Sequence, residues 1–304
     1  MSYAFDPELI PWVERLPKPD LSDVVRARAL AQRMLAQLPP APIPAGVTVT
    51  DTDAAGVPVR VYAPADRPTP RPALIYLHGG GFVTGSVESG HEEALRRTTE
   101  LGVVIVSVDY RLAPEHPFPA GLEDCYTALE WTAARADALG VDPARIAVGG
   151  ASAGAGLTAS LTQLTRVRCG PPICFQYLAI PELDDRLDTG SMRAFHDTPL
   201  WNRPLAQLSW SYYLGDRTDL DGVPAAPARA ADLTGLPPAF IAVCEFDPLR
   251  DEGLRYAQRL LAAGVGVELH LYPGTFHGCG VARDTAIVRR MTSDSDAALR
   301  RALH

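Results

Sequence analysis

A serine stands between two glycines in the segment GASAG, residues 150–154. This segment follows a short, largely apolar run, RIAVGG (145–150), and leads into a helix-forming stretch at 152–166. A strand that turns sharply into a helix strains its turn residue and lifts the hydroxyl of Ser152 toward the positive potential of a helix N-terminus. The flanking glycines let strand and helix approach without Cβ clashes. The pattern G-x-S-x-G in this context predicts that Ser152 is a nucleophile.

Three consecutive glycines form a second motif, HGGGF, at residues 78–82. Each glycine loosens the backbone, so the triplet does not serve helix or strand stability and suits a loop whose amides face an anion. A phosphate-binding loop would need a following Lys-Ser/Thr pair, which this sequence lacks. We therefore predict an oxyanion hole whose donors are the amides of Gly80, Gly81 and Ala153. The alternative is a glycine-rich turn without chemistry.

A serine hydroxyl is a poor nucleophile unless a base takes its proton. Among the seven histidines, His277 lies in a glycine-bounded loop, PGTFHGCG, just after the last predicted strand. His270 lies inside that strand, where we expect a packed or surface residue. His78 belongs to the glycine loop, which it would orient. The sequence therefore predicts His277 as the general base.

The third member of such a site is an acid that orients the imidazole and stabilises its charged form. The segment AFIAVCEFDPLRDEG (239–253) supplies the candidates. We prefer Asp247, because it is the first carboxylate that lies beyond the end of the strand. Glu245 and Asp251 are the alternatives, and we expect Asp251 inside the following helix. Asp247 could also cap that helix, with Pro248 at its first position. One residue can meet both needs only if its two oxygens are shared.

Eight short apolar or alternating runs predict the strands that must position these residues. They lie at 47–50, 57–62, 73–78, 103–110, 145–150, 173–180, 239–244 and 267–272. Helix-length stretches lie at 88–101, 121–139, 152–166, 203–214 and 248–263. The early runs alternate as an edge hairpin does, and the later ones are nearly all apolar, as in strands buried on both faces. We predict an α/β fold with a mostly parallel eight-stranded sheet and helices on both faces. The order Ser152, Asp247, His277 is the one expected on such a sheet.

An amphipathic helix is predicted at 21–38, between proline-rich segments. Asp20 or Ser22 would cap its start, and Pro39–Pro40 would forbid its continuation. A helix set off by prolines suggests an appendage on a larger body. It could be a packing helix only, or it could lie over an active site.

Domain organisation follows from these elements. We predict an N-terminal cap segment at 1–46 and a catalytic domain at 47–304. The alternation of strands and helices is interrupted by a long polar stretch around 182–215, which we interpret as a second piece of the cap. The candidate nucleophile, acid and base must converge across most of the chain, so one catalytic domain carries a discontinuous cap.

Composition excludes several other classes of protein. The chain has 304 residues, 47% of them hydrophobic and 21% charged, which argues against disorder. Its formal charge of −8 and the lack of a Lys/Arg cluster predict no nucleic-acid partner. The N-terminal segment does not resemble a signal peptide, and no apolar run is long enough to span a membrane. Five cysteines, an odd number without a CxxC pair, predict reduced thiols in a cytoplasmic protein and no metal site.

Five motifs together resemble the hormone-sensitive-lipase-like family of carboxylesterases (bacterial family IV), which has the α/β-hydrolase fold. They are HGGGF, DYRLAPEHPFPA (109–120), GASAG, DPLRDEG (247–253) and FHG (276–278), in that order over about residues 47–285. The resemblance implies a serine esterase that hydrolyses short- to medium-chain acyl esters through an acyl-enzyme, with a helical cap and no cofactor. It also implies that 109–120 braces the oxyanion loop and suggests a homodimer through a sheet edge.

This sequence departs from the family pattern GDSAGG, because it has GASAGA with Ala151 and Ala155. Ala151 removes a carboxylate beside the serine, which puts the usual support of that turn in doubt. Two other functions stay open: a non-catalytic small-molecule-binding homologue, which His277 argues against, and a lactonase or amidase with the same triad. Candidate residues of the substrate pocket, each of which could equally be ordinary core, are Phe82, Tyr110, Leu200, Trp201 and Phe246.

Overall fold

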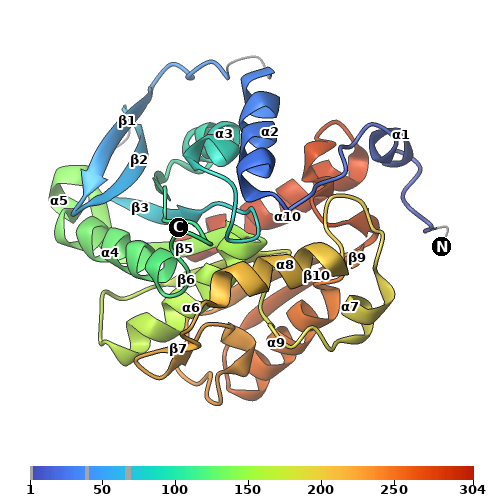
Figure 1. The fold of residues 1–304 in the computed structure, drawn as a ribbon. Helices are drawn as coiled ribbons and strands as arrows, with labels where there is room; N and C mark the ends of the chain where they lie inside the picture. The colour runs from blue at the N-terminus through green and yellow to red at the C-terminus, as the bar shows by residue number, and fades with distance from the viewer. Residues whose placement is uncertain (1–2, 38–40, 66–69) are drawn as a thin grey trace.

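The central sheet of the computed structural model has eight strands in the part of the chain that it describes, residues 3–37, 41–65 and 70–304. Their order is β1-β2-β4-β3-β5-β6-β9-β10 (Figure 1). The strands are β1 Val47–Ala54, β2 Val57–Pro64, β3 Arg71–Leu77, β4 Val104–Val108, β5 Val141–Ala151, β6 Phe175–Ala179, β9 Ala239–Phe246 and β10 Val267–Phe276. Each corresponds to one of the eight predicted runs, so the α/β fold with a mostly parallel sheet is confirmed.

The edge hairpin β1–β2 is antiparallel, as the alternation of its residues predicted. Its two-residue turn, Ala55–Gly56, has positive φ angles of 56° and 96°, which is the geometry that matches the twist of the flanking strands. β2 also pairs antiparallel with β4, and along the sheet from β4 to β10 neighbouring strands pair in parallel. The carboxyl ends of these parallel strands therefore meet at one edge of the sheet.

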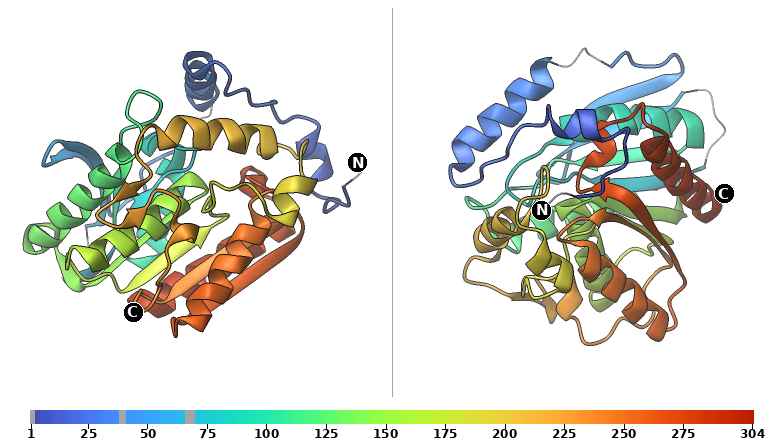
Figure 2. Two further views of the ribbon diagram at one scale, coloured as in Figure 1. Left: turned by 60° about the horizontal axis from the view of Figure 1, so that its bottom comes forward. Right: turned by 90° about the vertical axis from the view of Figure 1, so that its right-hand side faces the viewer.

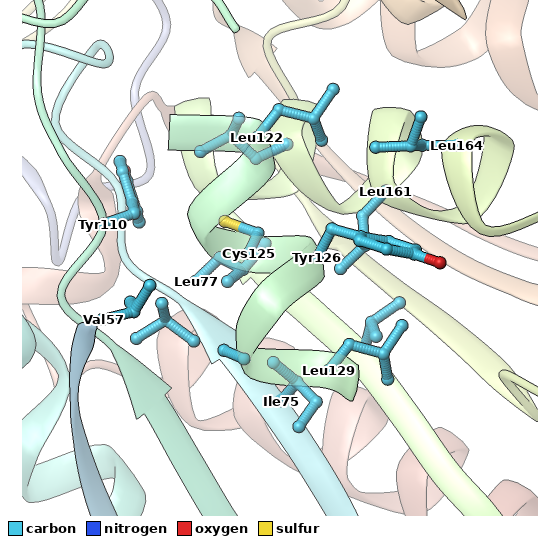
Figure 3. Packing of buried hydrophobic residues seen from close by; sticks show 14 of the residues in the cluster. Val57, Ile75, Leu77, Tyr110, Leu122, Cys125, Tyr126, Leu129, Leu161 and Leu164 are labelled. Carbon is cyan, nitrogen blue, oxygen red and sulfur yellow. The ribbon is translucent and has the colours of Figure 1, made fainter. Parts of the chain in front are cut away.

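Helices cover both faces of the sheet, since the strands are apolar on both sides. On one face lie α4 (Ala120–Ala134), α6 (Ala153–Val167) and α9 (Arg250–Ala262), and on the other lie α3 (His91–Leu101) and α10 (Ala286–Leu303). Figure 3 shows the first layer, where Leu122, Cys125 and Leu129 of α4 pack over Ile75 and Leu77 of β3. Burial of these apolar side chains, at about 25 cal/mol per Å², fixes the helices on the sheet.

Two segments lie outside this layered body (Figure 2). The N-terminal segment contains α1 (Ile10–Val13) and α2 (Val24–Gln37). The chain between β6 and β9 contains α7 (Gly190–Ala194), α8 (Arg203–Leu214) and a small antiparallel pair, β7 (Asp219–Leu220) with β8 (Val223–Pro224). This connection is longer than the predicted insertion, because the strand pair and a short turn of helix follow it before β9 begins.

The predicted N-cap residue of the N-terminal helix is wrong. Asp23, not Asp20 or Ser22, caps α2: its Oδ1 accepts from the amide of Arg26 at 3.0 Å. Asp20 instead accepts from the amide and hydroxyl of Ser22 in the preceding turn. The predicted stop at Pro39–Pro40 lies outside the described residues.

Within the described ranges no helix has the length and apolar character needed to cross a membrane. No group of three or more His, Cys, Asp or Glu side chains in those ranges is arranged to hold a metal ion. All five cysteines are free thiols, and Cys279 packs in a buried cluster with its Sγ 4.0 Å from that of Cys244.

Candidate active site

Ser152 lies at the turn between β5 and α6, where its backbone has φ 57° and ψ −122°. A non-glycine residue in this region is strained and persists only where the surroundings hold it. The flanking glycines explain how: a Cβ on Gly150 would lie 2.4 Å from the carbonyl oxygen of Leu77, and one on Gly154 would lie 2.1 Å from it. The amide of Ser152 donates to the carbonyl of Ala179 at 2.9 Å. The turn is thus packed directly against two neighbouring strands.

The imidazole of His277 connects the serine to an aspartate. Its Nε2 lies 2.9 Å from Ser152 Oγ, and its Nδ1 lies 2.8 Å from Asp247 Oδ2. The three side chains come from the carboxyl ends of β5, β9 and β10, and their exposed fractions are 7% for Ser152, 1% for Asp247 and 6% for His277. An ionised carboxylate only accepts, so Nδ1 carries the proton and Nε2 faces the serine as an acceptor. This tautomer can take the hydroxyl proton.

The second oxygen of Asp247 is also used, in a turn and not in a helix cap. Oδ1 accepts from the amide of Leu249 at 2.8 Å, and the carbonyl of Asp247 accepts from the amide of Arg250 at 3.1 Å. The helix α9 begins only at Arg250, with Leu249 as its cap residue. The alternative that Asp247 is the N-cap, with Pro248 in first helical position, is therefore wrong, because the chain completes a turn first.

The two other candidate acids point to different partners. Asp251 lies inside α9, as expected, and its Oδ2 accepts from the amide of Ser191 at 2.7 Å. Glu245 Oε2 accepts from the amide of Gly274 at 2.7 Å. The two carboxylates bind backbone amides of α7 and of β10, and neither contacts His277.

The glycine loop runs beside the nucleophile. A Cβ on Gly79 would lie 3.0 Å from the carbonyl oxygen of Ala151 and 3.5 Å from Ser152 Cβ. Gly80 and Gly81 have φ angles of 129° and 58°, which side chains rarely adopt, and the amide of Thr84 closes the turn onto the carbonyl of Gly80 at 2.9 Å.

Three amides are left open by this arrangement. Those of Gly80, Gly81 and Ala153 donate to no acceptor among residues 3–37, 41–65 and 70–304. A backbone amide without a protein partner is free for a ligand oxygen. These are the donors that the sequence predicted.

The segment 109–120 lies under the glycine loop and holds it. The hydroxyl of Tyr110 donates to the carbonyl of His78 at 2.7 Å, and the two rings stack with centroids 4.2 Å apart. The amide of Ala113 donates to the carbonyl of Phe82 at 3.0 Å. His78 Nδ1 lies 2.9 Å from the carbonyl of Gly79, and burial lowers the pKa of this imidazole. His78 therefore orients the loop as a neutral ring.

Two of the five candidate pocket residues lie beside the catalytic groups. The ring of Trp201 is 5.8 Å from that of His277, and a Cβ on Gly81 would lie 2.5 Å from Trp201 Cη2. Leu200 packs against Gly278, where a Cβ would lie 3.0 Å from Leu200 Cδ1. Both come from the insertion, just before α8.

The other three belong to packed clusters. Phe82 stacks on Tyr213 with centroids 4.0 Å apart, and Tyr110 lies in the same buried core. Phe246 joins an aromatic group with Phe5 and Tyr3 of the N-terminal segment, at 5.4 and 5.6 Å. Phe82 and Tyr110 are thus buried in the core, whereas Phe246 is half-buried among these rings.

Two residues near the site were not found from the sequence. Glu182 is fully buried, and burial raises its pKa to about 8. Ser209 of α8 lies within hydrogen-bond distance of Glu182 and of the glycine loop. The sequence contains a signal for Glu182, because it is the one carboxylate in the otherwise apolar LAIPEL segment. Nothing in the sequence marks Ser209, because only the tertiary fold brings α8 to the glycine loop.

A separate cavity of about 380 Å³ contains none of these groups. It is lined in part by Arg186, Arg229, Arg255 and Arg259. Asp184 pairs with Arg186, Asp185 with Arg229, and Asp188 with Arg255 at 3.9 Å. These pairs leave the cavity with little surplus positive charge.

The strand order, the serine at a strand–helix turn, and the histidine and aspartate on the following strand ends define the α/β-hydrolase fold. Residues 74–281 match the family model described as alpha/beta hydrolase fold. The chain belongs to this family, in its hormone-sensitive-lipase-like branch of carboxylesterases.

Relatives with known names agree with this assignment. The carboxylesterase NlhH of Mycobacterium tuberculosis is 42% identical over 252 residues, which cover 82% of this chain and 79% of the relative. The esterase LipI of the same organism is 37% identical and covers 99% of this chain and 96% of its own length. Among solved structures, a bacterial heroin esterase superposes with a TM-score of 0.93 at 46% identity, over 99% of this chain and 98% of the other. This protein is therefore a carboxylic ester hydrolase.

Proposed function

We propose that the protein is a serine carboxylesterase that hydrolyses short- to medium-chain acyl esters through an acyl-enzyme on Ser152. The observation that carries the proposal is the continuous chain of contacts from Ser152 Oγ through His277 to Asp247, at 2.9 and 2.8 Å. In this geometry His277 is the general base, and Asp247 holds its tautomer and stabilises the imidazolium.

The reaction proceeds in two balanced steps. Ser152 Oγ attacks the ester carbonyl carbon as His277 Nε2 takes its proton, and the amides of Gly80, Gly81 and Ala153 hold the oxyanion. The C–O bond to the alcohol then breaks, with the proton passing from His277 to the departing oxygen. Water repeats the sequence on the acyl-enzyme, which releases the carboxylic acid and restores Ser152.

The N-terminal segment 1–46 and the insertion around 182–215 serve as a discontinuous cap over the catalytic domain in this proposal. Support comes from Trp201 and Leu200, which the insertion brings to His277 and Gly278. Tyr212 of α8 also donates to the carbonyl of Leu21 at 3.1 Å, so the two parts of the cap contact each other. Selectivity for the acyl group would be set here, because the triad itself does not distinguish substrates.

Replacement of the nucleophile tests the proposal. Ser152→Ala should abolish turnover of p-nitrophenyl butyrate while circular dichroism and thermal unfolding stay unchanged. The matched control is Ser211→Ala, since the Ser211 hydroxyl donates only to the carbonyl of Leu208 on its own helix. Near-normal turnover by Ser152→Ala would refute the assignment.

A substrate panel distinguishes the remaining alternatives. p-Nitrophenyl esters of increasing chain length, an anilide and a lactone should show fastest turnover for the short and medium esters. Faster turnover of the lactone or the amide would favour the lactonase or amidase alternative, and binding without turnover would favour a non-catalytic homologue.

The expectations of a homodimer and of a cytoplasmic location stay predictions. The edge strand β10 has exposed Leu269 and Leu271, a surface that a second sheet edge could cover. Sedimentation of wild type and of a Leu271→Lys variant tests the dimer.

A further inference from the structure

Glu182 is a buried carboxyl group for which the proposed triad has no use. It follows β6 directly, and its amide donates to the carbonyl of Ser152 at 3.2 Å, so it lies next to the nucleophile. Its Oε1 is 3.0 Å from Ser209 Oγ, and its Oε2 has no hydrogen-bond partner in the described part of the chain. A buried ionised carboxylate with an empty oxygen is costly, which favours the neutral acid.

Ser209 connects this carboxyl group to the glycine loop. Its Oγ lies 2.9 Å from the carbonyl oxygen of Gly81 as well as 3.0 Å from Glu182 Oε1. The hydroxyl has one proton, and a carbonyl oxygen can only accept. Both contacts are full two-centre hydrogen bonds only if Ser209 donates to Gly81 and Glu182 donates to Ser209. Without a proton on Glu182, the single Ser209 proton would be shared between two acceptors in a weaker three-centre contact. The two short distances therefore favour a proton on Glu182.

We propose that Glu182 is a positioning residue: as a neutral acid it donates to Ser209, which in turn anchors the carbonyl of Gly81 and fixes the oxyanion loop. The inference rests on the proposed function in that the loop is taken to stabilise the oxyanion. Gly81 supplies one of the three open amides, and as a glycine it has no side chain that could hold its φ of 58°. The anchor comes from α8, so it also couples the insertion to the catalytic groups.

The surroundings of Glu182 agree with a neutral acid. Burial and, as a smaller effect, the negative charge of Asp247 raise its pKa to about 8 against the opposing effect of the Ser209 contact. The other titratable groups that face it are Tyr213 of α8 and Glu252 of α9, and burial raises the pKa of both. Glu252 Oε1 accepts from the amide of Leu183 at 2.6 Å, so Glu252 is a neighbour with a different partner.

Loss of this proton has a definite consequence. As the pH rises past about 8, the new carboxylate becomes the stronger acceptor and takes the Ser209 hydroxyl proton in a hydrogen bond. The carbonyl of Gly81 then loses its only side-chain donor in the described residues, and this part of the loop is held less firmly. We expect kcat to fall about tenfold across this transition, the value of one hydrogen bond, with little change in KM.

Two variants and a control test the relay in pH profiles of ester hydrolysis. Glu182→Gln can still donate to Ser209 but cannot ionise, so it should keep kcat within about threefold and lose the alkaline fall. Ser209→Ala removes the anchor at every pH, so kcat should be about tenfold low on both sides of pH 8, without the transition. Glu252→Gln should retain the wild-type profile. The same alkaline fall in Glu182→Gln, or a normal kcat in Ser209→Ala, would overturn the proposal.

A measurement without substrate separates the relay from the proposed function. The infrared difference spectrum of wild type minus Glu182→Gln should contain the carbonyl stretch of a protonated carboxyl group at neutral pH and lose it as the pH passes about 8. Because the difference cancels Glu252, which is present in both proteins, the band reports on Glu182 alone. Identical bands in wild type and Glu182→Gln would refute the neutral acid even in an active enzyme. Failure of p-nitrophenyl ester turnover with the band intact would refute the proposed function instead.

Discussion

The Nε atom of Arg28 lies 2.8 Å from the carbonyl oxygen of Val83 and donates to it, which attaches the N-terminal helix α2 to the end of the glycine loop. The same guanidinium donates through Nη2 to the carbonyl of Ala113 at 2.8 Å and forms a two-pronged contact with Glu115. Arg28 thus bridges the loop and the segment that braces it. Because α2 has no fully buried residue, this one side chain is a main restraint on the helix.

Arg28→Ala should loosen α2 and weaken the support of the glycine loop. We expect kcat/KM for p-nitrophenyl butyrate to fall about tenfold, because two hydrogen bonds to carbonyl groups are lost at a partly exposed site. Arg28→Lys should not restore it, since an ammonium group cannot form the planar fork. Arg33→Ala is the matched control, because Arg33 donates to Ala29 within its own helix. Equal loss in both variants would assign the effect to helix propensity.

Asp247→Asn should reduce kcat by about 10⁴-fold, because an amide in place of the carboxylate favours the wrong tautomer of His277 and cannot stabilise its charge. Asp251→Asn should leave kcat within about threefold, since Asp251 contacts Ser191 and Arg250 and not the histidine. Steady-state kinetics with thermal unfolding of each variant checks this. The opposite ranking would move the acid role to Asp251.

Gly80→Ala should abolish most of the activity. A methyl group there would lie 2.1 Å from the carbonyl oxygen of Thr84, at a φ of 129° that alanine rarely adopts, so the loop must move. Displacing one oxyanion donor costs about 10²–10³ in kcat. Gly266→Ala is the control, because a Cβ at Gly266 meets nothing within 4 Å. If Gly80→Ala retained kcat, the amide of Gly80 would not be a donor.

The fold and the positions of the candidate site residues could be predicted because their sequence signals are local. Each strand is a short apolar or alternating run. Ser152 and the glycine loop lie in short motifs, GASAG and HGGGF, whose glycines are typical of a nucleophile turn and an oxyanion loop. Asp247 and His277 could be placed beside Ser152 because each comes just after a predicted strand, and parallel strands end at the same edge of the sheet.

Long-range contacts were not predictable in the same way. Ser209 lies outside every motif recognised in the sequence, and its contact with the glycine loop depends on how α8 crosses that loop. The cap of α2 was misassigned because Asp20, Ser22 and Asp23 are all good cap residues, and only the backbone shows which one the helix follows. The pair β7–β8 is too short for periodicity to identify.

Glu93 on α3 should make stability depend on pH in the acid range. Burial opposes its ionisation, but the guanidinium groups of Arg97 and Arg96 outweigh this and hold its pKa at about 2, below the usual 4.5. A pKa that is lower in the folded protein means that the carboxylate stabilises the fold above about 4.5 and that this stabilisation is lost as the pH falls toward 2.

Glu93→Gln should therefore lower the free energy of unfolding at neutral pH, and the difference from wild type should shrink progressively between pH 4.5 and 2. Urea unfolding at a series of pH values measures this difference. Glu100→Gln is the control on the same helix, because Glu100 meets Arg96 at the surface with half of its side chain exposed, and such pairs contribute little. A constant difference between Glu93→Gln and wild type at all pH values would mean that packing at this position, and not ionisation of Glu93, accounts for its contribution to stability.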